Sequence, residues 1–138
     1  MVRSDIIYMS NSLFLIFNHT FTDVQREDAI SSLGVSRIVD MPRDFKAIWS
    51  SIPPDMEFIC YYLEPVQIWL RQKAEPGDYV LIQGDFGACY IMVNYAFTLG
   101  LVPVYSTTGR ETKESVLKDG TVKVTRHFQH RFFRRYEQ

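Results

Sequence analysis

The sequence predicts an α/β fold with a mostly parallel sheet, flanking helices and a C-terminal β-hairpin. As far as Arg110, short apolar runs alternate with segments of helical periodicity, which is typical of β-α-β units. After Arg110, two strand-like segments flank Asp119-Gly120, a strong hairpin signal. The 138 residues, 46% of them apolar, suffice for one ordinary core, so we expect a single domain over residues 1–138.

The first predicted elements are a strand and a helix. The apolar run Leu13–Phe17 predicts a buried strand, and the polar residues after it predict a loop. Thr22 and Gln25 have the spacing of a capping box, which predicts a helix over residues 23–33. Gly34 is well placed to end that helix.

The middle of the chain predicts a second strand and then helices. Residues 36–41 form the strand, and residues 44–51 form a short helix that two prolines close. Asp55 is a candidate cap for a helix whose apolar residues recur every three to four positions up to Leu70. Pro65 lies inside this pattern, so we expect a kink or two abutting helices there.

Two further strands and a helix complete the parallel part of the predicted fold. Residues 79–83 predict the third strand, and residues 86–99 predict the helix after it. Residues 102–105 predict a fourth strand that leads into a polar loop. We expect the basic hairpin over residues 112–138, and we interpret residues 1–12 as an N-terminal extension.

Charge is distributed unevenly along the chain. The net charge of -1 argues against a general nucleic-acid binder. Residues 1–109 carry seven Lys/Arg against twelve Asp/Glu, whereas residues 110–138 carry eight against four. No apolar run approaches the roughly 18–20 residues of a membrane span, and the start lacks the apolar core of a signal peptide. We therefore expect a cytoplasmic protein that binds neither DNA nor membranes.

The two cysteines give no sign of a metal site. Cys60 and Cys89 lie in apolar helical patterns, and neither has a Cys or His nearby at metal-ligand spacing. We expect buried free thiols, and the sequence indicates neither a metal nor another cofactor.

One candidate binding segment follows the third strand. It therefore lies at the edge of the sheet where the carboxyl ends of the parallel strands meet, and ligands of open α/β sheets bind at this edge. Its glycines permit a tight turn, and the amides that open the next helix attract anions. Asp85 would repel a phosphate, so we expect it to cap the helix or to bond a ribose hydroxyl or base edge. A capped turn whose glycines serve only packing explains the same residues. The candidates are Gly84, Asp85, Phe86, Gly87 and Ala88.

Two more polar segments follow the first and fourth strands. After the fourth strand, the hydroxyls of residues 106–108 and the guanidinium of Arg110 suit phosphate oxygens, and the arginine can bind them bidentately. The alternative for this segment is a solvated polar turn. His19 is a candidate general base, a phosphate donor or an ordinary loop histidine. The candidates are Asn18, His19, Thr20, Ser106, Thr107, Thr108 and Arg110.

The basic C-terminal segment interleaves cations with aromatic residues. This pattern neutralises phosphates and stacks bases. An amphipathic strand with aromatic residues in the core explains it equally well. Arg126, His127 and His130 are the candidate ligand contacts, and no further metal ligands accompany the two histidines.

Several segments carry a resemblance to a known family: LFLIFNHTFT, SLGV, IWSSIPP, the stretch from GDYVLIQGDFGA to PVYSTTGRE, and DGTVKVTRHFQHRFFRRYE. LIQGDFGA with PVYSTTGR about twenty residues later is the most specific pair. With these segments, the chain from Leu13 onward resembles the CRISPR-associated Csx-type ring nucleases of type III systems. Residues 1–12 lie outside the resemblance.

The resemblance implies a Rossmann-like domain related in shape to the CARF sensor domains, and a homodimer around the ligand. It implies that the ligand is a cyclic oligoadenylate, specifically cyclic tetra-adenylate, which the enzyme cuts to end antiviral signalling. Metal-independent cleavage would use in-line attack by a ribose 2′-hydroxyl on the adjacent phosphate. The catalytic candidates are then His19, Arg110 and His127, with His130 as a further candidate base.

Two other functions are consistent with the same residues. One is a module that binds or sequesters the cyclic messenger without cutting it. The other is a Rossmann-like domain that binds another nucleotide or a sugar phosphate, for example as a transferase. The preferred ring size and the identity of the base stay open at this point.

Overall fold

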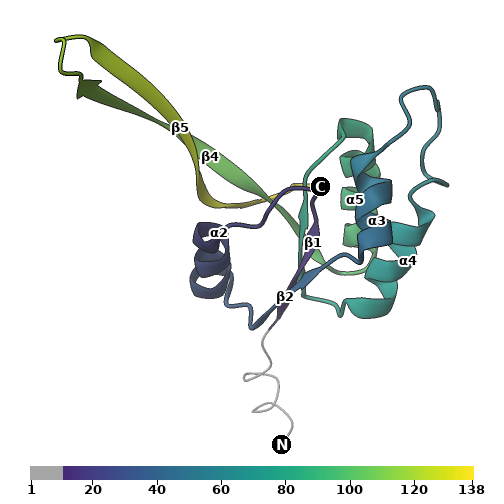
Figure 1. Ribbon diagram of the computed structural model, residues 1–138. Coiled ribbons are helices and arrows are strands. Elements are labelled where there is room, and N and C mark those ends of the chain that lie inside the picture. The colour runs from purple at the N-terminus through teal and green to yellow at the C-terminus, as the bar shows by residue number, and fades with distance from the viewer. Residues whose placement is uncertain (1–10) are drawn as a thin grey trace, which may run out of the picture.

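A five-stranded sheet forms the centre of the computed structural model, which describes residues 11–138 (Figure 1). The strands lie in the order β2-β1-β3-β4-β5. Their bounds are β1 (Ser12–Ile16), β2 (Arg37–Asp40), β3 (Tyr79–Ile82), β4 (Val102–Val116) and β5 (Val122–Arg135). The first four run parallel to one another, and β5 is antiparallel to β4. The predicted α/β fold with a C-terminal hairpin is confirmed.

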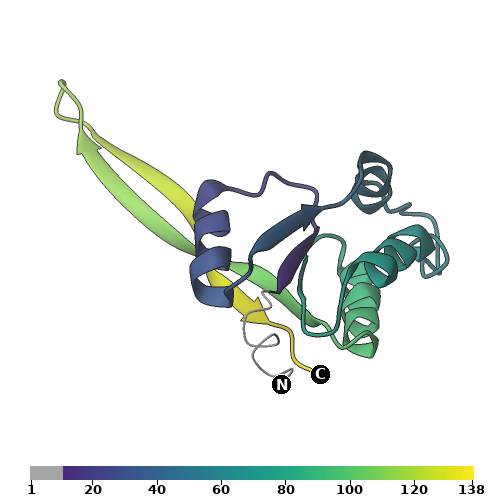
Figure 2. The ribbon, with the colours of Figure 1, turned by 90° about the horizontal axis from the view of Figure 1, so that it is seen from below.

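Helices cover both faces of this sheet (Figures 1 and 2). On one face lie α3 (Arg43–Ser50), α4 (Glu64–Lys73) and α5 (Phe86–Thr98), and on the other lies α2 (Asp23–Asp28). Successive side chains of a strand point to opposite faces. Phe14 and Ile16 therefore join the larger core under α3–α5, while Leu13 and Leu15 join the smaller core under α2. No helix among the described residues is long and apolar enough to cross a membrane.

The helix after β1 begins and ends where its sequence signals predict. The Thr22 hydroxyl accepts a hydrogen bond from the Gln25 amide (3.2 Å), and the Gln25 side chain accepts one from the Thr22 amide (2.8 Å). Gly34 ends the helical segment in the left-handed region, at φ 69°. Inside the segment the expectation of one α-helix is wrong, because a π-helical turn, η1 (Ala29–Leu33), follows α2. The expectations for residues 1–10 lie outside the described residues, but Ser12 opens β1, so it is not part of an extension.

The segment between α3 and α4 is not helical. Turns and irregular backbone occupy residues 51–63, and α4 starts at Glu64 with Pro65 in its first turn. Proline has no amide hydrogen, and amides of the first turn have no acceptor inside the helix, so Pro65 starts this helix without kinking it. The prediction of a helix from Asp55 is therefore wrong. Cys60 consequently lies exposed on a turn, which corrects the expectation of a buried thiol.

β4 and β5 form a long hairpin that projects from the body of the molecule (Figures 1 and 2). They pair from Val104 opposite Arg135 to Val116 opposite Val122. The predicted polar loop at residues 106–110 and the hairpin start at residue 112 are therefore wrong, because β4 continues through both. Gly120, at φ 87°, confirms the turn predicted at Asp119-Gly120. We call the projecting part, residues 108–130, the arm.

Candidate functional site

The segments that follow β1 and β3 meet β4 at one edge of the sheet. The amide of Gln83 donates to the carbonyl of Ile16 (3.2 Å), and the amide of Ser106 donates to Oε1 of Gln83 (2.7 Å). This is the edge at which the carboxyl ends of the parallel strands lie, where α/β proteins bind their ligands. Side chains from these segments enter separate hollows on the two faces of the sheet.

A polar hollow of about 380 Å³ lies at the carboxyl ends of β1 and β2. We call it the His19 hollow; it is lined by Asn18, His19, Thr20, Arg26, Asp40 and Lys46. Leu15 and Ile38 form its base and belong to the smaller core, so it opens on the face that α2 covers. It combines an imidazole, an amide, a hydroxyl and two cations, groups that suit the oxygens of a phosphate, with one carboxylate, Asp40, which is paired with Lys46.

Packing and pairing position the charged groups of the His19 hollow. The guanidinium carbon of Arg26 lies 5.9 Å from the ring centroid of Phe21, which stacks on Phe133. Lys46 forms an ion pair with Asp40. The ring of His19 packs edge-to-face on Phe17, with centroids 5.5 Å apart.

Sequence reasoning did not identify Arg26 and Lys46 as site residues. Each is the fourth residue of the helix that follows a parallel strand, Arg26 in α2 and Lys46 in α3. The first turn of such a helix lies near the carboxyl edge of the sheet, so a polar side chain there can reach a ligand at that edge. This position in the sequence could have identified both residues.

Packing explains much of the segment between β3 and α5. A Cβ atom on Gly84 would lie 2.7 Å from Nε1 of Trp49, which itself donates to the carbonyl of Gln83 (2.8 Å). The carboxylate of Asp85 accepts a hydrogen bond from the amide of Ala88 (3.0 Å), which confirms the predicted helix cap. Because that carboxylate stands at the first turn of α5, the turn is a poor site for a phosphate.

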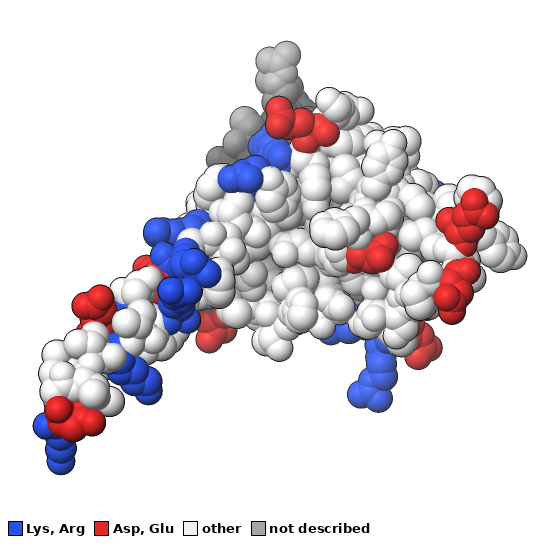
Figure 3. Space-filling model, turned by 90° about the horizontal axis from the view of Figure 1, so that it is seen from above, with Lys and Arg blue, Asp and Glu red and all other residues white. Residues whose placement is uncertain are grey.

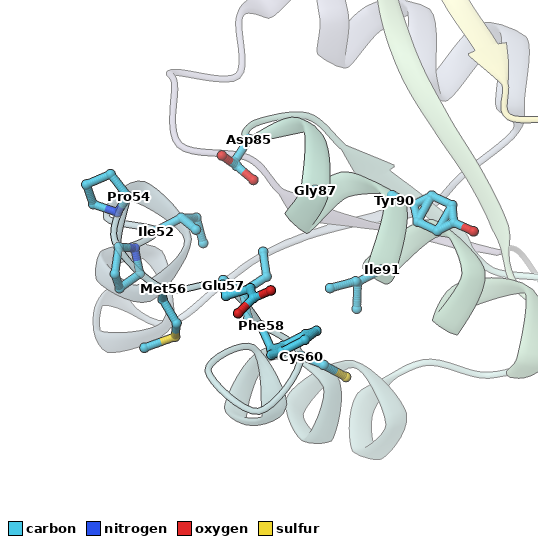
Figure 4. A pocket seen from close by; sticks show the side chains of 12 residues that line it. Ile52, Pro54, Met56, Glu57, Phe58, Cys60, Asp85, Gly87, Tyr90 and Ile91 are labelled. Atoms are coloured by element: carbon cyan, nitrogen blue, oxygen red, sulfur yellow. The ribbon is translucent and has the colours of Figure 1, made fainter.

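A second hollow, of about 530 Å³, lies between α5 and the turns of residues 51–63 (Figure 4). Its lining includes Met56, Phe58, Asp85, Gly87 and Tyr90, and Glu57 also points into it (Figure 4). We call it the loop hollow. Its walls are apolar, and its lining has two carboxylates and no Lys or Arg, so it does not suit an anion.

A third and larger hollow, of about 710 Å³, lies on the face that α5 covers. We call it the tyrosine hollow; it is lined by Gln83, Phe86, Tyr90, Asn94, Tyr105 and Tyr136, among others. It shares Tyr90 with the loop hollow and no residue with the His19 hollow. Sequence reasoning identified only Phe86 among its aromatic residues.

A chain of hydrogen bonds ties α2 to the base of the arm. Nε2 of His130 lies 2.6 Å from a carboxylate oxygen of Asp28, and Nδ1 lies 2.5 Å from Oγ of Ser106. Gln25 donates to the same Oγ (3.3 Å), and in the neutral form of the imidazole Nε2 donates to Asp28 while Nδ1 accepts from the serine hydroxyl. This assignment follows from the donors and acceptors of the network.

The same three residue types form the catalytic triad of serine hydrolases, but the arrangement here differs. In a triad, Nε2 faces the serine and Nδ1 faces the aspartate; here the nitrogens have the opposite partners. The side chain of His130 is only 4% exposed. These residues therefore form a structural tie, with Ser106 and His130 inside it and unavailable to a ligand.

A β-bulge directs His130 toward this tie. Ser106 pairs with Phe133 and Thr108 pairs with His130, so two residues of β5 stand opposite Thr107. A bulge of this kind changes the direction of a side chain, and the rings of His130 and Phe133 lie on one face with centroids 4.5 Å apart. The hydroxyl of Thr107 is bonded to the backbone of Phe132 at the bulge, so Thr107 has a structural role.

The remaining candidate residues lie on the arm. The strand alternation places Thr108, Arg110 and Arg126 on one face and His127 on the other. Arg110 lies over the ring of Phe128, at 5.5 Å from its centroid. No hollow described above includes an arm residue. Within one chain, these arm residues therefore do not share a hollow with His19.

Positive charge gathers where the arm joins the body (Figure 3). β5 contains five Lys/Arg and no Asp/Glu. Within residues 11–138, no three His, Cys, Asp or Glu side chains are grouped so that they could hold a metal ion.

Comparison with known proteins identifies the family of this chain. Residues 11–134 match the model of the "Uncharacterized protein MJ1673 family". The chain belongs to this family. It is 47% identical over 124 residues to "Uncharacterized protein MJ1673" of Methanocaldococcus jannaschii, an alignment that covers 90% of this chain and 95% of that protein. No solved structure matches the chain.

Proposed function

We propose that the protein is a ring nuclease that binds cyclic oligoadenylate, most often cyclic tetra-adenylate, and cuts it in the cytoplasm to end type III CRISPR signalling. The observation that carries this proposal is the His19 hollow, where an imidazole and two cations line the ligand-binding edge of the sheet. The sequence resemblance to Csx-type ring nucleases supports the choice of ligand.

The proposed reaction is a transesterification within the ring. The ribose 2′-hydroxyl attacks the adjacent phosphorus in line, the bond from phosphorus to the 5′ oxygen breaks, and a 2′,3′-cyclic phosphate forms. His19 takes the proton of the 2′-hydroxyl, and the departing 5′ oxygen takes a proton from solvent or from His127. Arg26 and Lys46 stabilise the additional negative charge on the phosphorane oxygens. No step in this scheme requires a metal ion.

A homodimer allows the arm to take part in this reaction. Arg110, Arg126 and His127 lie outside the hollows of their own chain, so they reach a ligand only if the arm extends over a second copy. The arm carries five Lys/Arg against three Asp/Glu and the remainder of the chain carries ten against thirteen, so the two parts are complementary in charge.

The arm also offers an unpaired apolar surface for such contact. The face that carries Ser106 and His130 at its base continues outward through four exposed apolar residues, Val116, Val122, Val124 and Phe128, which alternate with Arg110, Thr112, Glu114 and Arg126 on the same face. We call these four residues the apolar arm face; Val116 is 76% and Phe128 is 68% exposed. At the base α2 covers this face, and a second copy would cover its outer part.

The direct test is incubation of the purified protein with cyclic tetra-adenylate in excess EDTA, followed by mass spectrometry. We expect linear products that end in a 2′,3′-cyclic phosphate. An intact ring after prolonged incubation at high protein concentration would contradict cleavage, and parallel reactions with the cyclic trimer and hexamer measure the preferred ring size.

A binding module that does not cut the ring is the second candidate function. It is favoured by one observation: within residues 11–138, no hydrogen bond orients the ring of His19, although general bases are ordinarily held by a partner. In this case calorimetry shows tight binding of one ring per dimer, while chromatography shows that the ring stays intact.

A further inference from the structure

Aromatic rings from three separate segments line the tyrosine hollow. Phe86 and Tyr90 lie one turn apart on α5, so they share a face of the helix. Tyr105 belongs to β4, and Tyr136 follows β5. Phe86 is 96% exposed, although it lies at the start of a well-packed helix. Packing within this chain therefore gives no reason for a phenylalanine at that position.

The wall formed by Tyr105 and Tyr136 is held by hydrogen bonds. The hydroxyl of Tyr136 donates to the carbonyl of Ile82 (2.7 Å), and the two tyrosine rings lie 4.8 Å apart. Arg134 donates to the hydroxyl of Tyr105 (2.8 Å) and lies over its ring. Burial raises the pKa of Tyr136 to about 12, so its hydroxyl stays a donor at neutral pH. A wall fixed in this way loses little entropy when a ligand binds.

The charges around the hollow indicate which part of a ligand enters it. The lining contains no Lys or Arg, and Glu137 contributes a carboxylate, so a phosphate group is disfavoured inside. Gln83 and Asn94 each use one amide atom in a bond to the backbone. Within residues 11–138, the other atom of each, Nε2 of Gln83 and Oδ1 of Asn94, remains available. One is a donor and the other an acceptor, as the edge of a nitrogen heterocycle requires.

We propose that the tyrosine hollow is a nucleobase-binding subsite, in which a base stacks against the rings of Phe86 and Tyr90. Arg134, beside Tyr105, takes the adjoining phosphate outside the hollow. If the base belongs to a cyclic oligoadenylate, the subsite rests on the proposed function. If the base belongs to another nucleotide, the subsite is independent of that function. A ring seated across the sheet edge then places a phosphate in the His19 hollow on one face and a base in the tyrosine hollow on the other.

Phe86 permits a clean test, because its side chain makes little contact with the rest of the fold. Base stacking on an aromatic side chain contributes enough that truncation to alanine costs roughly tenfold or more in affinity. We expect Phe86→Ala to weaken binding of cyclic tetra-adenylate, measured by calorimetry, by about that factor. Phe86→Trp should retain wild-type affinity.

Phe58→Ala is the matched control. Phe58 is likewise exposed, at 80%, but it lines the loop hollow. We expect it to change the affinity less than twofold. Equal affinities for the wild type and Phe86→Ala, or equal losses for Phe86→Ala and Phe58→Ala, would overturn the subsite while leaving the proposed function intact.

A second measurement separates the subsite from the proposed function. If the wild-type protein does not bind the ring, the proposed function fails, and adenosine 5′-monophosphate then tests the hollow alone. In an NMR titration we expect chemical-shift changes at Tyr90, Asn94 and Tyr105, with adenosine giving the same pattern and inorganic phosphate giving none of it. Absence of those changes at millimolar nucleotide would overturn the subsite.

Discussion

Individual residues at the sheet edge show how packing and binding are separated within one short segment. Gly84 and Gly87 lie three positions apart, yet only Gly84 lies against another side chain closely enough to exclude a Cβ atom. The indole of Trp49 fills that space and bonds to the backbone of Gln83. Gly84 is thus required by the core, whereas Gly87 has room for a larger residue.

This difference leads to a prediction about stability. Gly84→Ala should lower the free energy of unfolding by about 1–3 kcal/mol, because Trp49 or the backbone must move to admit the methyl group. Gly87→Ala, where the nearest atoms are 3.5 Å and 3.7 Å away, should be neutral or slightly stabilising in a helix. Urea denaturation of the two variants checks this, and equal effects would contradict the role assigned to Trp49.

His19 carries a prediction about turnover. If it is the general base, His19→Ala should reduce the cleavage rate by about 10²- to 10⁴-fold while changing the affinity for the ring only a few-fold. Single-turnover kinetics and calorimetry measure the two quantities separately. His127→Ala tests separately whether His127 donates the proton to the departing 5′ oxygen, because only then should it also lower the cleavage rate. Equal losses of rate and affinity in His19→Ala would instead assign His19 to binding.

At the scale of elements, the tie between α2 and β5 holds the base of the arm. Asp28 and His130 are 102 residues apart in the sequence, and the side chain of Asp28 is 21% exposed. Burial alone would raise the pKa of Asp28. Hydrogen bonds from Ser32 and His130, together with the charge of His130, outweigh burial and lower the pKa below its usual value of 3.8.

The tie therefore predicts a pH-dependent contribution to stability. Since the pKa of Asp28 is lowered by folding, its carboxylate stabilises the protein above pH 3.8, and this stabilisation disappears as the pH falls through the folded-state pKa. Asp28→Asn should cost about 1.5–3 kcal/mol at pH 7, the range for a hydrogen bond to a charged group. The deficit should shrink when unfolding is measured at a pH below 3.8.

The neighbouring residue provides a control for that experiment. Glu27→Gln removes a charge from the same helix at an exposed position, and we expect a change within about 0.5 kcal/mol at either pH. A deficit in Asp28→Asn that stays constant with pH would show that the carboxylate charge is not what stabilises the tie.

Elements with local signals were predictable from the sequence, and those fixed by distant contacts were not. Thr22, Gln25 and Gly34 specify the start and end of one helical segment through bonds to near neighbours. Pro65 was misinterpreted because the apolar periodicity continues across it, although α4 begins there. Residues 106–110 look like a loop because they are polar, and only pairing with β5 makes them a strand.

The residues of the candidate site likewise differ in whether a local sequence signal or a distant contact determines their place. His19 lies at the predicted edge, in a hollow with Asn18 and Thr20. Asp28 gave no signal, because its partner on β5 lies so far away in the sequence. The aromatic residues of the tyrosine hollow come from three separate segments, so no motif contains them.

At the scale of the whole molecule, the arm predicts how two copies associate. In the proposed homodimer the apolar arm face is buried, so a charge placed there should dissociate the dimer. We expect wild-type protein to have twice the mass of one 16.2 kDa chain, and Val124→Glu to have the mass of one chain. Thr125→Glu, on the opposite face of the same strand, should remain dimeric. Light scattering after size-exclusion chromatography distinguishes these outcomes, and a monomeric wild type would contradict the proposal.

The β-bulge at Thr107 has a consequence for how the arm can vary in length. Beyond the bulge, side chains alternate with a period of two, so the arm can lengthen by two residues in each strand and keep the same side chains on each face. One residue inserted into β4 between Thr108 and the turn would move the later β4 side chains of the arm, including Val116, to the opposite face. The body would be unaffected, because the insertion lies in the projecting part of the hairpin and the pairing at its base stays the same. Arm length is therefore free to change in this fold only in even steps.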